Sequence, residues 1–95
     1  MYKAIKVLNR KTWFRSIRPG DVSKGQFKDY NALKSISVQL AGYNASEGKK
    51  YGVYIHAKYL SSGLCVILVG VTLKQRKREL EDPDCKDEWR KLIKE

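Results

Sequence analysis

The feature that most constrains the fold is the apolar run from Leu64 to Val71, which Thr72 follows. The run is rich in β-branched residues and almost uninterrupted, a pattern typical of a strand that is buried on both faces of a sheet. At about eight residues it is far shorter than the roughly 20 needed to cross a bilayer. It therefore predicts the central strand of a compact fold.

A second β-rich stretch precedes this run. Residues 51–59 are rich in Tyr, Val and Ile, and the short segment Leu60-Ser61-Ser62-Gly63 separates the two stretches. Two such stretches joined by a short glycine-containing loop are typical of an antiparallel hairpin. We expect the strand over 51–59 to be half exposed and the strand over 64–72 to be central.

The N-terminal residues predict two further strands. Residues 2–8 alternate imperfectly between apolar and charged side chains, which indicates a strand. Asn9-Arg10-Lys11 is interpreted as a turn into a second strand over 12–17, which contains β-branched and aromatic residues. Arg18-Pro19-Gly20-Asp21 then predicts a type II turn, because proline suits its second position and glycine its third.

A long helix is predicted over residues 24–47. A capping box and a hydrophobic staple mark its start, formed by Ser23 with Gln26 and by Val22 with Phe27. Apolar residues then recur at helical spacing: Leu33, Ile36, Leu40 and Tyr43. Residues 35–40 also alternate as a strand would, and a strand over 35–43 would make the fold a small β-barrel. The agreement of the signals at both ends, with Gly48 as the stop, favours the helix.

The C-terminal residues predict two helical segments. Residues 73–81 are highly charged and are expected to be helical or frayed. Asp82 and Pro83 suit the N-cap and first position of a second helix over 83–94, which ends in basic residues that complement its dipole. The apolar residues of this helix are expected to dock on the sheet: Trp89, Leu92 and Ile93.

Together these elements predict one α+β domain over residues 1–95. Ninety-five residues leave no room for a second core. We expect an antiparallel sheet of three to four strands with the two helices packed against it. The predicted core consists of Leu33, Ile36, Leu40, Tyr43, Val53, Ile55, Val66, Leu68, Val69, Trp89 and Leu92.

The charge balance indicates an anionic partner. The chain has 20 Lys and Arg against 10 Asp and Glu, a formal net charge of +10. The excess is concentrated in the first 25 residues, while residues 74–95 are nearly neutral apart from their first few. Such a balance favours binding to nucleic acid, or to an acidic protein or nucleoprotein surface.

Basic residues form a first cluster at 10–18, a second cluster at 74–78, and a pair between them, Lys49 and Lys50, which we call the linking pair. In the first cluster, Trp13 and Phe14 lie among cations. In the strand predicted here, Trp13 shares a face with Lys11 and Arg15, which makes it the better candidate for an exposed ring that stacks on bases. Burial of both rings is an equally weighted alternative. The second cluster is either a phosphate-contacting surface or a solvated helix face paired with Glu79 and Glu81. The candidate nucleic-acid-binding residues are Arg10, Lys11, Trp13, Arg15, Arg18, Lys49, Lys50, Lys74, Arg76, Lys77 and Arg78.

Catalytic, metal and cofactor motifs are scarce. Cys65 and Cys85 match no zinc spacing, and the glycines match no phosphate-binding loop. We expect no metal or cofactor, a pair of free thiols in a reducing compartment, no signal peptide, and a soluble cytoplasmic protein. An enzyme would have to use Tyr54, His56 and Lys58, which share one face of their strand, with the cations of residues 76–78.

The layout resembles that of a known family. A strand, a helix, an antiparallel hairpin that ends in basic residues and a terminal helix are similar in order to RelE-like ribosome-dependent ribonuclease toxins, chiefly over residues 51–78. The Gly-apolar-Arg-apolar-Arg strand of those toxins is absent here, so no catalytic residue is transferred. The resemblance implies ribonuclease activity as a third possible function.

The function favoured by the sequence is non-enzymatic binding of nucleic acid. A basic chain without a catalytic set suits a small accessory factor, of viral or mobile-element type, that acts on host nucleic acid or a nucleoprotein complex. The alternative is a protein-binding inhibitor or adaptor that docks its basic face on an acidic partner. Both predict an exposed basic surface, and they differ in the partner that covers it.

Overall fold

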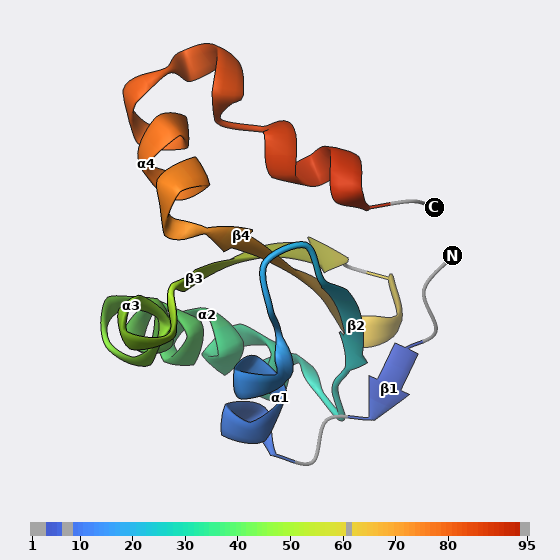
Figure 1. Cartoon of the computed structure of the whole chain (residues 1–95). Coiled ribbons are helices and arrows are strands. Elements are labelled where there is room, and N and C mark those ends of the chain that lie inside the picture. Colours follow the sequence, from blue (N-terminus) through green and yellow to red (C-terminus); the bar gives the residue numbers. More distant parts are fainter. Residues whose placement is uncertain (1–3, 7–8, 61, 94–95) are drawn as a thin grey trace.

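A computed structural model of the chain describes residues 4–6, 9–60 and 62–93, with the side chains of 4–6 and 62 left out of the description. Figure 1 shows the elements in chain order: β1 (Ala4–Lys6), α1 (Arg10–Ser16), β2 (Val22–Gln26), α2 (Tyr30–Ala45), α3 (Glu47–Tyr51), β3 (Val53–Leu60), η1 (Ser62–Leu64), β4 (Cys65–Thr72), α4 (Leu73–Glu81), η2 (Pro83–Cys85) and η3 (Glu88–Leu92), where η marks a 3₁₀ helix. The predicted α+β class is confirmed.

The sheet has the order β1-β2-β4-β3. β4 pairs antiparallel with β2 on one side and with β3 on the other. β1 adds an edge strand that runs parallel to β2. The predicted hairpin is confirmed as β3 and β4, and the apolar run is the central strand, buried from Cys65 to Val71.

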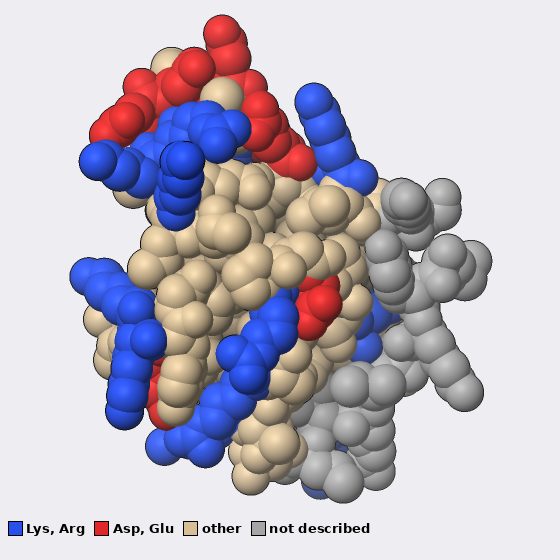
Figure 2. All heavy atoms as spheres, viewed as in Figure 1, with Lys and Arg blue, Asp and Glu red and all other residues tan. Residues whose placement is uncertain are grey.

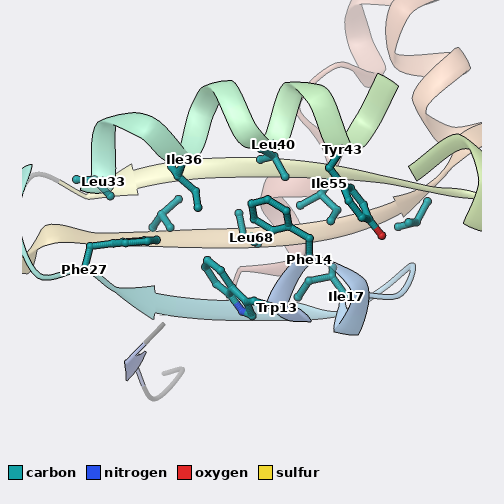
Figure 3. Close-up of a cluster of buried hydrophobic side chains, with 12 residues drawn as sticks. Trp13, Phe14, Ile17, Phe27, Leu33, Ile36, Leu40, Tyr43, Ile55 and Leu68 are labelled. Atoms are coloured by element: carbon teal, nitrogen blue, oxygen red, sulfur yellow. The ribbon is translucent and has the colours of Figure 1, made fainter. Parts of the chain in front are cut away.

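One face of the sheet carries the larger core. Figure 3 shows helix α2 above the sheet and the aromatic residues of α1 below the same cluster. Leu33, Ile36, Leu40 and Tyr43 of α2 meet Ile55, Val66 and Leu68 of the sheet, with Trp13, Phe14 and Ile17 closing the cluster. The predicted helix over residues 35–43 is therefore confirmed, and its strand alternative is wrong.

The opposite face is covered by the C-terminal segment, which Figure 1 shows on the side of the sheet away from α2. Trp89 packs on Ile67, Val69 and Val71 of β4. The predicted core is confirmed except for Leu92, which is 36% exposed. Ile93, the residue after Leu92, is partly buried and packs against the cluster that Trp89 forms with β4.

The predicted turn at 9–11 and the predicted strand over 12–17 are wrong, because residues 10–16 form helix α1, with Asn9 as its N-cap and Ile17 as its C-cap. Asn9 caps the helix by accepting a hydrogen bond from the backbone N–H of Thr12 at 3.1 Å. Trp13, Phe14 and Ile17 have i, i+1, i+4 spacing, so a helix buries all three at once. A strand would have placed neighbours 13 and 14 on opposite faces.

The predicted start of the long helix is also wrong. Residues 22–26 form β2, and α2 begins at Tyr30 with Asp29 as its N-cap, accepting from Ala32 N–H at 2.8 Å. Pairing with β4 gives the backbone N–H and C=O groups of residues 22–26 hydrogen-bond partners along the strand, and this outweighs the local capping signal. The helix then ends at Ala45, and residues 47–51 form a separate helix, α3.

Three other expectations have mixed outcomes. The turn at 18–21 is confirmed: Asp21 N–H donates to Arg18 O at 2.9 Å, and Gly20 has a φ of +93°. The helix predicted over 83–94 is wrong, because two short 3₁₀ helices, η2 and η3, replace it. The strand predicted over 2–8 is observed at 4–6, and residues 2, 3, 7 and 8 lie outside the described residues.

Candidate nucleic-acid interface

Both rings of the first basic cluster are buried. Trp13 is 6% exposed and Phe14 2% exposed, so the expectation of an exposed Trp13 is wrong. The Trp13 indole N–H donates to the hydroxyl of Ser23 at 2.8 Å, which satisfies its polar atom inside the core. The physical reason is the helix: the strand alternation that placed Trp13 beside Lys11 and Arg15 does not apply to α1.

The cations of α1 separate into two environments. Lys11 and Arg15 are exposed and lie at i, i+4 spacing on the outer side of the helix. Arg10 is instead half-buried: its guanidinium donates to Ala32 O at 3.2 Å and lies 5.7 Å from the Phe27 ring centroid. Arg10 therefore fastens α1 to α2, and Lys11 and Arg15 are the residues left facing outward.

A groove of about 450 Å³ runs between α1 and the C-terminal end of α2; we call it the α1–α2 groove. Its lining includes Lys11, Arg15 and Glu47. Arg15 bonds the Glu47 carboxylate at 2.8 Å, and this hydrogen bond, together with the negative charge, raises the pKa of Arg15. Glu47 thus neutralises part of the charge of Arg15, while Lys11 supplies a second cation to the same groove.

A second groove, of about 390 Å³, lies between α4 and the end of α2 with α3; we call it the α3–α4 groove. It is lined by Ala41, Asn44, Ala45, Lys49, Tyr54, Leu73, Arg76 and Leu80. Most of this lining is apolar, and one cation comes from α3 and the other from α4. The linking pair and the second basic cluster of the sequence therefore meet at one groove.

Arg76 is held in a fixed position at this groove. Its guanidinium carbon lies 4.1 Å from the centroid of the Tyr54 ring, a cation–π contact. One of its terminal nitrogens, Nη1, lies 3.7 Å from Oε1 of Glu79. The side chain is 29% exposed. Tyr54 and Glu79 thus orient the guanidinium, and part of it still faces solvent.

A buried pair, His56 and Glu79, contacts Arg76 through the Glu79 carboxylate. Glu79 is 5% exposed, and its Oε1 lies 2.8 Å from Nε2 of His56. Burial lowers the pKa of His56 more than the neighbouring carboxylate raises it. The other oxygen of Glu79, Oε2, is buried and accepts no hydrogen bond from the described residues. The pair joins α4 to β3 beneath the groove.

The sequence did not predict this pair. It placed Glu79 on a solvated helix surface, and this expectation is wrong because the residue points inward toward His56, 23 positions away. The predicted common face of Tyr54 and His56 does exist, with their ring centroids 5.0 Å apart. His56 is enclosed, however, since Trp89 stacks on it and its side chain is 10% exposed. The only local signal for Glu79 is its i, i+3 spacing from Arg76.

The remaining candidate cations are exposed. Lys50 lies on α3, Lys74, Lys77 and Arg78 lie on α4, and Arg18 follows α1 without lining either groove. Figure 2 shows basic side chains over α1, α3 and α4 on one face, with uncharged surface between them. Acidic side chains gather over the outer end of α4 and η2 in the same view. Acidic residues therefore border the basic side chains of α4 at the outer end of this helix.

Helix α3 connects the two grooves. It contributes Glu47 to one and Lys49 to the other. Its position depends on Gly48, because a Cβ there would lie 2.7 Å from the carbonyl oxygen of Val53. Gly52, with a φ of +75°, ends the helix and turns the chain into β3. Two glycines thus hold α3 close against the sheet and place its lysines between α1 and α4.

Other site chemistry is sparse in the described part of the chain. Cys65 is buried and Cys85 is partly buried, and both are free thiols. Among the described residues, no group of three or more His, Cys, Asp or Glu could hold a metal ion. Within the same ranges, no helix combines the length and apolar content that crossing a membrane requires.

Comparison of the chain with protein-family models, with curated proteins and with solved structures found no significant match. The similarity in layout to RelE-like toxins therefore rests on the order of elements in the sequence alone.

Proposed function

We propose that the protein binds nucleic acid through the surface formed by α1, α3 and α4. The observation that carries the proposal is the position of α3, which adjoins both the α1–α2 groove and the α3–α4 groove. Cations from three separate parts of the chain consequently lie along one surface: Lys11 and Arg15, Lys49, and Arg76. A net charge of +10 attracts a polyanion to such a surface.

The proposed activity is binding without catalysis. The enclosed position of His56, the sole histidine of the chain, supports this, because a general base has to reach the proton that it removes. The free thiols Cys65 and Cys85 support a reducing compartment such as the cytoplasm. In this setting an accessory factor of viral or mobile-element type would act on host nucleic acid.

Fluorescence anisotropy with labelled DNA and RNA oligonucleotides tests the proposal. The affinity should fall steeply between about 50 and about 200 mM salt, because binding releases condensed counterions. Absence of binding at the lower salt concentration would overturn the proposal.

A pair of double variants tests the location of the surface. Lys49→Ala with Lys50→Ala removes two charges from α3, and Lys86→Ala with Lys91→Ala removes two exposed charges from the C-terminal segment. Both variants have the same net charge. The first should bind more weakly and reduce the salt slope by about 0.7–0.9 per lost phosphate contact, while the second should bind like the parent. Equal losses in both would mean that only net charge matters.

A further inference from the structure

The α3–α4 groove has a lining that suits bases better than phosphates. Leu80 is 70% exposed and Leu73 38% exposed, and with Ala41 and Ala45 they form an apolar floor. Lys49 and Arg76 are the two cations of the lining. A double helix presents phosphates to such cations, but its bases are paired and stacked inside, so the apolar floor would stay uncovered. The unpaired bases of a single strand can cover it.

Arg76 offers a flat surface at the same place. Its guanidinium carbon lies over the Tyr54 ring, 4.1 Å from the ring centroid, and Oε1 of Glu79 lies 3.7 Å from Nη1. The side chain remains 29% exposed within the groove. Guanidinium planes are a surface on which unpaired bases stack. Because Arg76 is already oriented, little of its conformational freedom remains to be lost on binding.

The polar lining of the groove offers little for reading a base sequence. The Asn44 side-chain amide donates to the carbonyl of Ile55 at 3.0 Å and accepts from the backbone N–H of Ile55 at 2.9 Å. These two bonds hold α2 on β3 and occupy the one amide side chain of the lining. Recognition by stacking is tolerant of sequence, because every base has a π-face.

We infer that the α3–α4 groove binds single-stranded nucleic acid, with a base stacked on the outer face of the Arg76 guanidinium. The inference rests on the proposed function and specifies its ligand class. Arg76 is the contacting residue, and Tyr54 and Glu79 are positioning residues. Lys49, across the groove, neutralises the backbone phosphate of the same strand.

Arg76→Lys is the variant that separates stacking from charge, because lysine keeps the positive charge but lacks the planar group. Arg90→Lys is the matched control, the same exchange at an exposed arginine outside the proposed surface, whose guanidinium carbon lies 5.1 Å from the centroid of the Trp89 ring. Anisotropy is measured with a labelled oligothymidine and with a labelled hairpin duplex. Arg76→Lys should weaken single-strand binding at least about fivefold, the lower end of a stacking contribution, and leave duplex binding unchanged. Arg90→Lys should change neither.

A second variant guards against a folding defect. Tyr54→Leu removes the ring under Arg76 and keeps the floor apolar, and thermal melting verifies that each variant is folded. Tyr54→Leu should weaken single-strand binding in the parent but cause no further loss in Arg76→Lys, because both act on one stack.

The outcomes distinguish the two proposals. If the parent protein binds neither probe at low salt, the proposed function fails and the inference fails with it. If the parent binds, but Arg76→Lys loses no single-strand affinity, or loses equal affinity for both probes, the inference is overturned while nucleic-acid binding stands. A loss of affinity in Arg76→Lys for the single strand alone supports the inference.

Discussion

The imidazole of His56 lies flat on the indole of Trp89, with ring centroids 4.5 Å apart and an angle of 5° between the planes. This stack joins β3 to the C-terminal segment, in which Trp89 also packs on Ile67, Val69 and Val71 of β4. Because the hydrogen bond to Glu79 is on the same imidazole, one histidine connects three parts of the chain: β3, α4 and η3. The position of α4, and with it the α3–α4 groove, therefore depends on packing on the face of the sheet opposite α2.

Trp89→Ala should destabilise the protein strongly. Trp89 is 6% exposed, and its removal leaves Ile67, Val69 and Val71 without their cover. A buried tryptophan replaced by alanine costs about 3–5 kcal/mol, and we expect a loss within that range in the free energy of unfolding, measured by urea denaturation. Leu80→Ala, at a residue that is 70% exposed, is the control and should stay within about 0.5 kcal/mol of the parent. Equal effects of the two changes would contradict this packing.

The stability of the protein should fall as the pH drops through about 6.5, the ordinary pKa of histidine. Burial lowers the pKa of His56 in the folded state, so the unfolded chain binds more protons in this range. The contribution of neutral His56 is therefore fully present above pH 6.5 and decreases below it. Urea denaturation at several pH values between about 8 and about 5 measures the slope.

His56→Gln is the control for this pH dependence. Glutamine does not titrate, yet its amide can still donate to Glu79, and no other histidine is present in the chain. The variant should lose the part of the slope near pH 6.5 and keep the part at lower pH that comes from carboxyl groups. An unchanged slope would show that His56 is not the titrating group.

The elements that the sequence predicted correctly are those whose pattern is local. The β3–β4 hairpin follows from two β-rich stretches, and the burial of β4 on both faces follows from its unbroken apolar run. The middle of α2 follows from Leu33, Ile36 and Leu40. The turn at 18–21 follows from Pro19 and Gly20, whose backbone preferences act without help from the rest of the chain.

The elements that the sequence missed depend on distant partners. Residues 22–26 carry a helix-start signal, yet they pair with residues 65–69 of β4, on the side of β4 that β3 leaves unpaired. Residues 12–17 have β-forming side chains, yet a helix places Trp13 and Phe14 together in one core. Local propensity is a weak preference that such long-range packing overrides.

The candidate site was predicted in composition but not in arrangement. The sequence identified the cations of both clusters and of the linking pair. The structure brings Lys11, Arg15, Lys49 and Arg76 to grooves, while Arg10 makes a structural contact instead. The burial of Glu79 was not predictable, because it depends on His56 in another strand. Pattern analysis shows which residues are charged, and only the fold shows which of them share a surface.

Gly70→Ala should be strongly destabilising. A Cβ at Gly70 would collide with the carbonyl oxygen of Arg18 and lie 2.9 Å from Cγ2 of Ile17. The turn at 18–21 closes on this residue, since Gly20 N–H donates to Gly70 O at 2.8 Å and Gly70 N–H donates to Asp21 O at 3.0 Å. Overpacking against backbone costs about 1–3 kcal/mol or more, which chemical denaturation detects.

Gly42→Ala is the matched control, with the opposite sign. Its added Cβ would meet nothing within 4 Å, and the residue lies inside helix α2. Alanine in a helix interior is favoured over glycine by about 0.5–1 kcal/mol, so this variant should be more stable than the parent. A neutral Gly70→Ala would contradict the close approach of the turn to β4, and a destabilised Gly42→Ala would contradict the open space beside this position of α2.

Trp13→Phe should lower stability without affecting nucleic-acid binding. The indole N–H donates to Ser23 at 2.8 Å inside the core, and a phenylalanine ring loses that bond, a net effect of about 1 kcal/mol, along with part of its packing. A double-mutant cycle with Ser23→Ala in urea denaturation should give a coupling of about 1 kcal/mol between the two side chains. Anisotropy on the folded variant should give the affinity of the parent, because Trp13 is 6% exposed and has no open face for a base. Loss of affinity at unchanged stability would instead make Trp13 a binding residue.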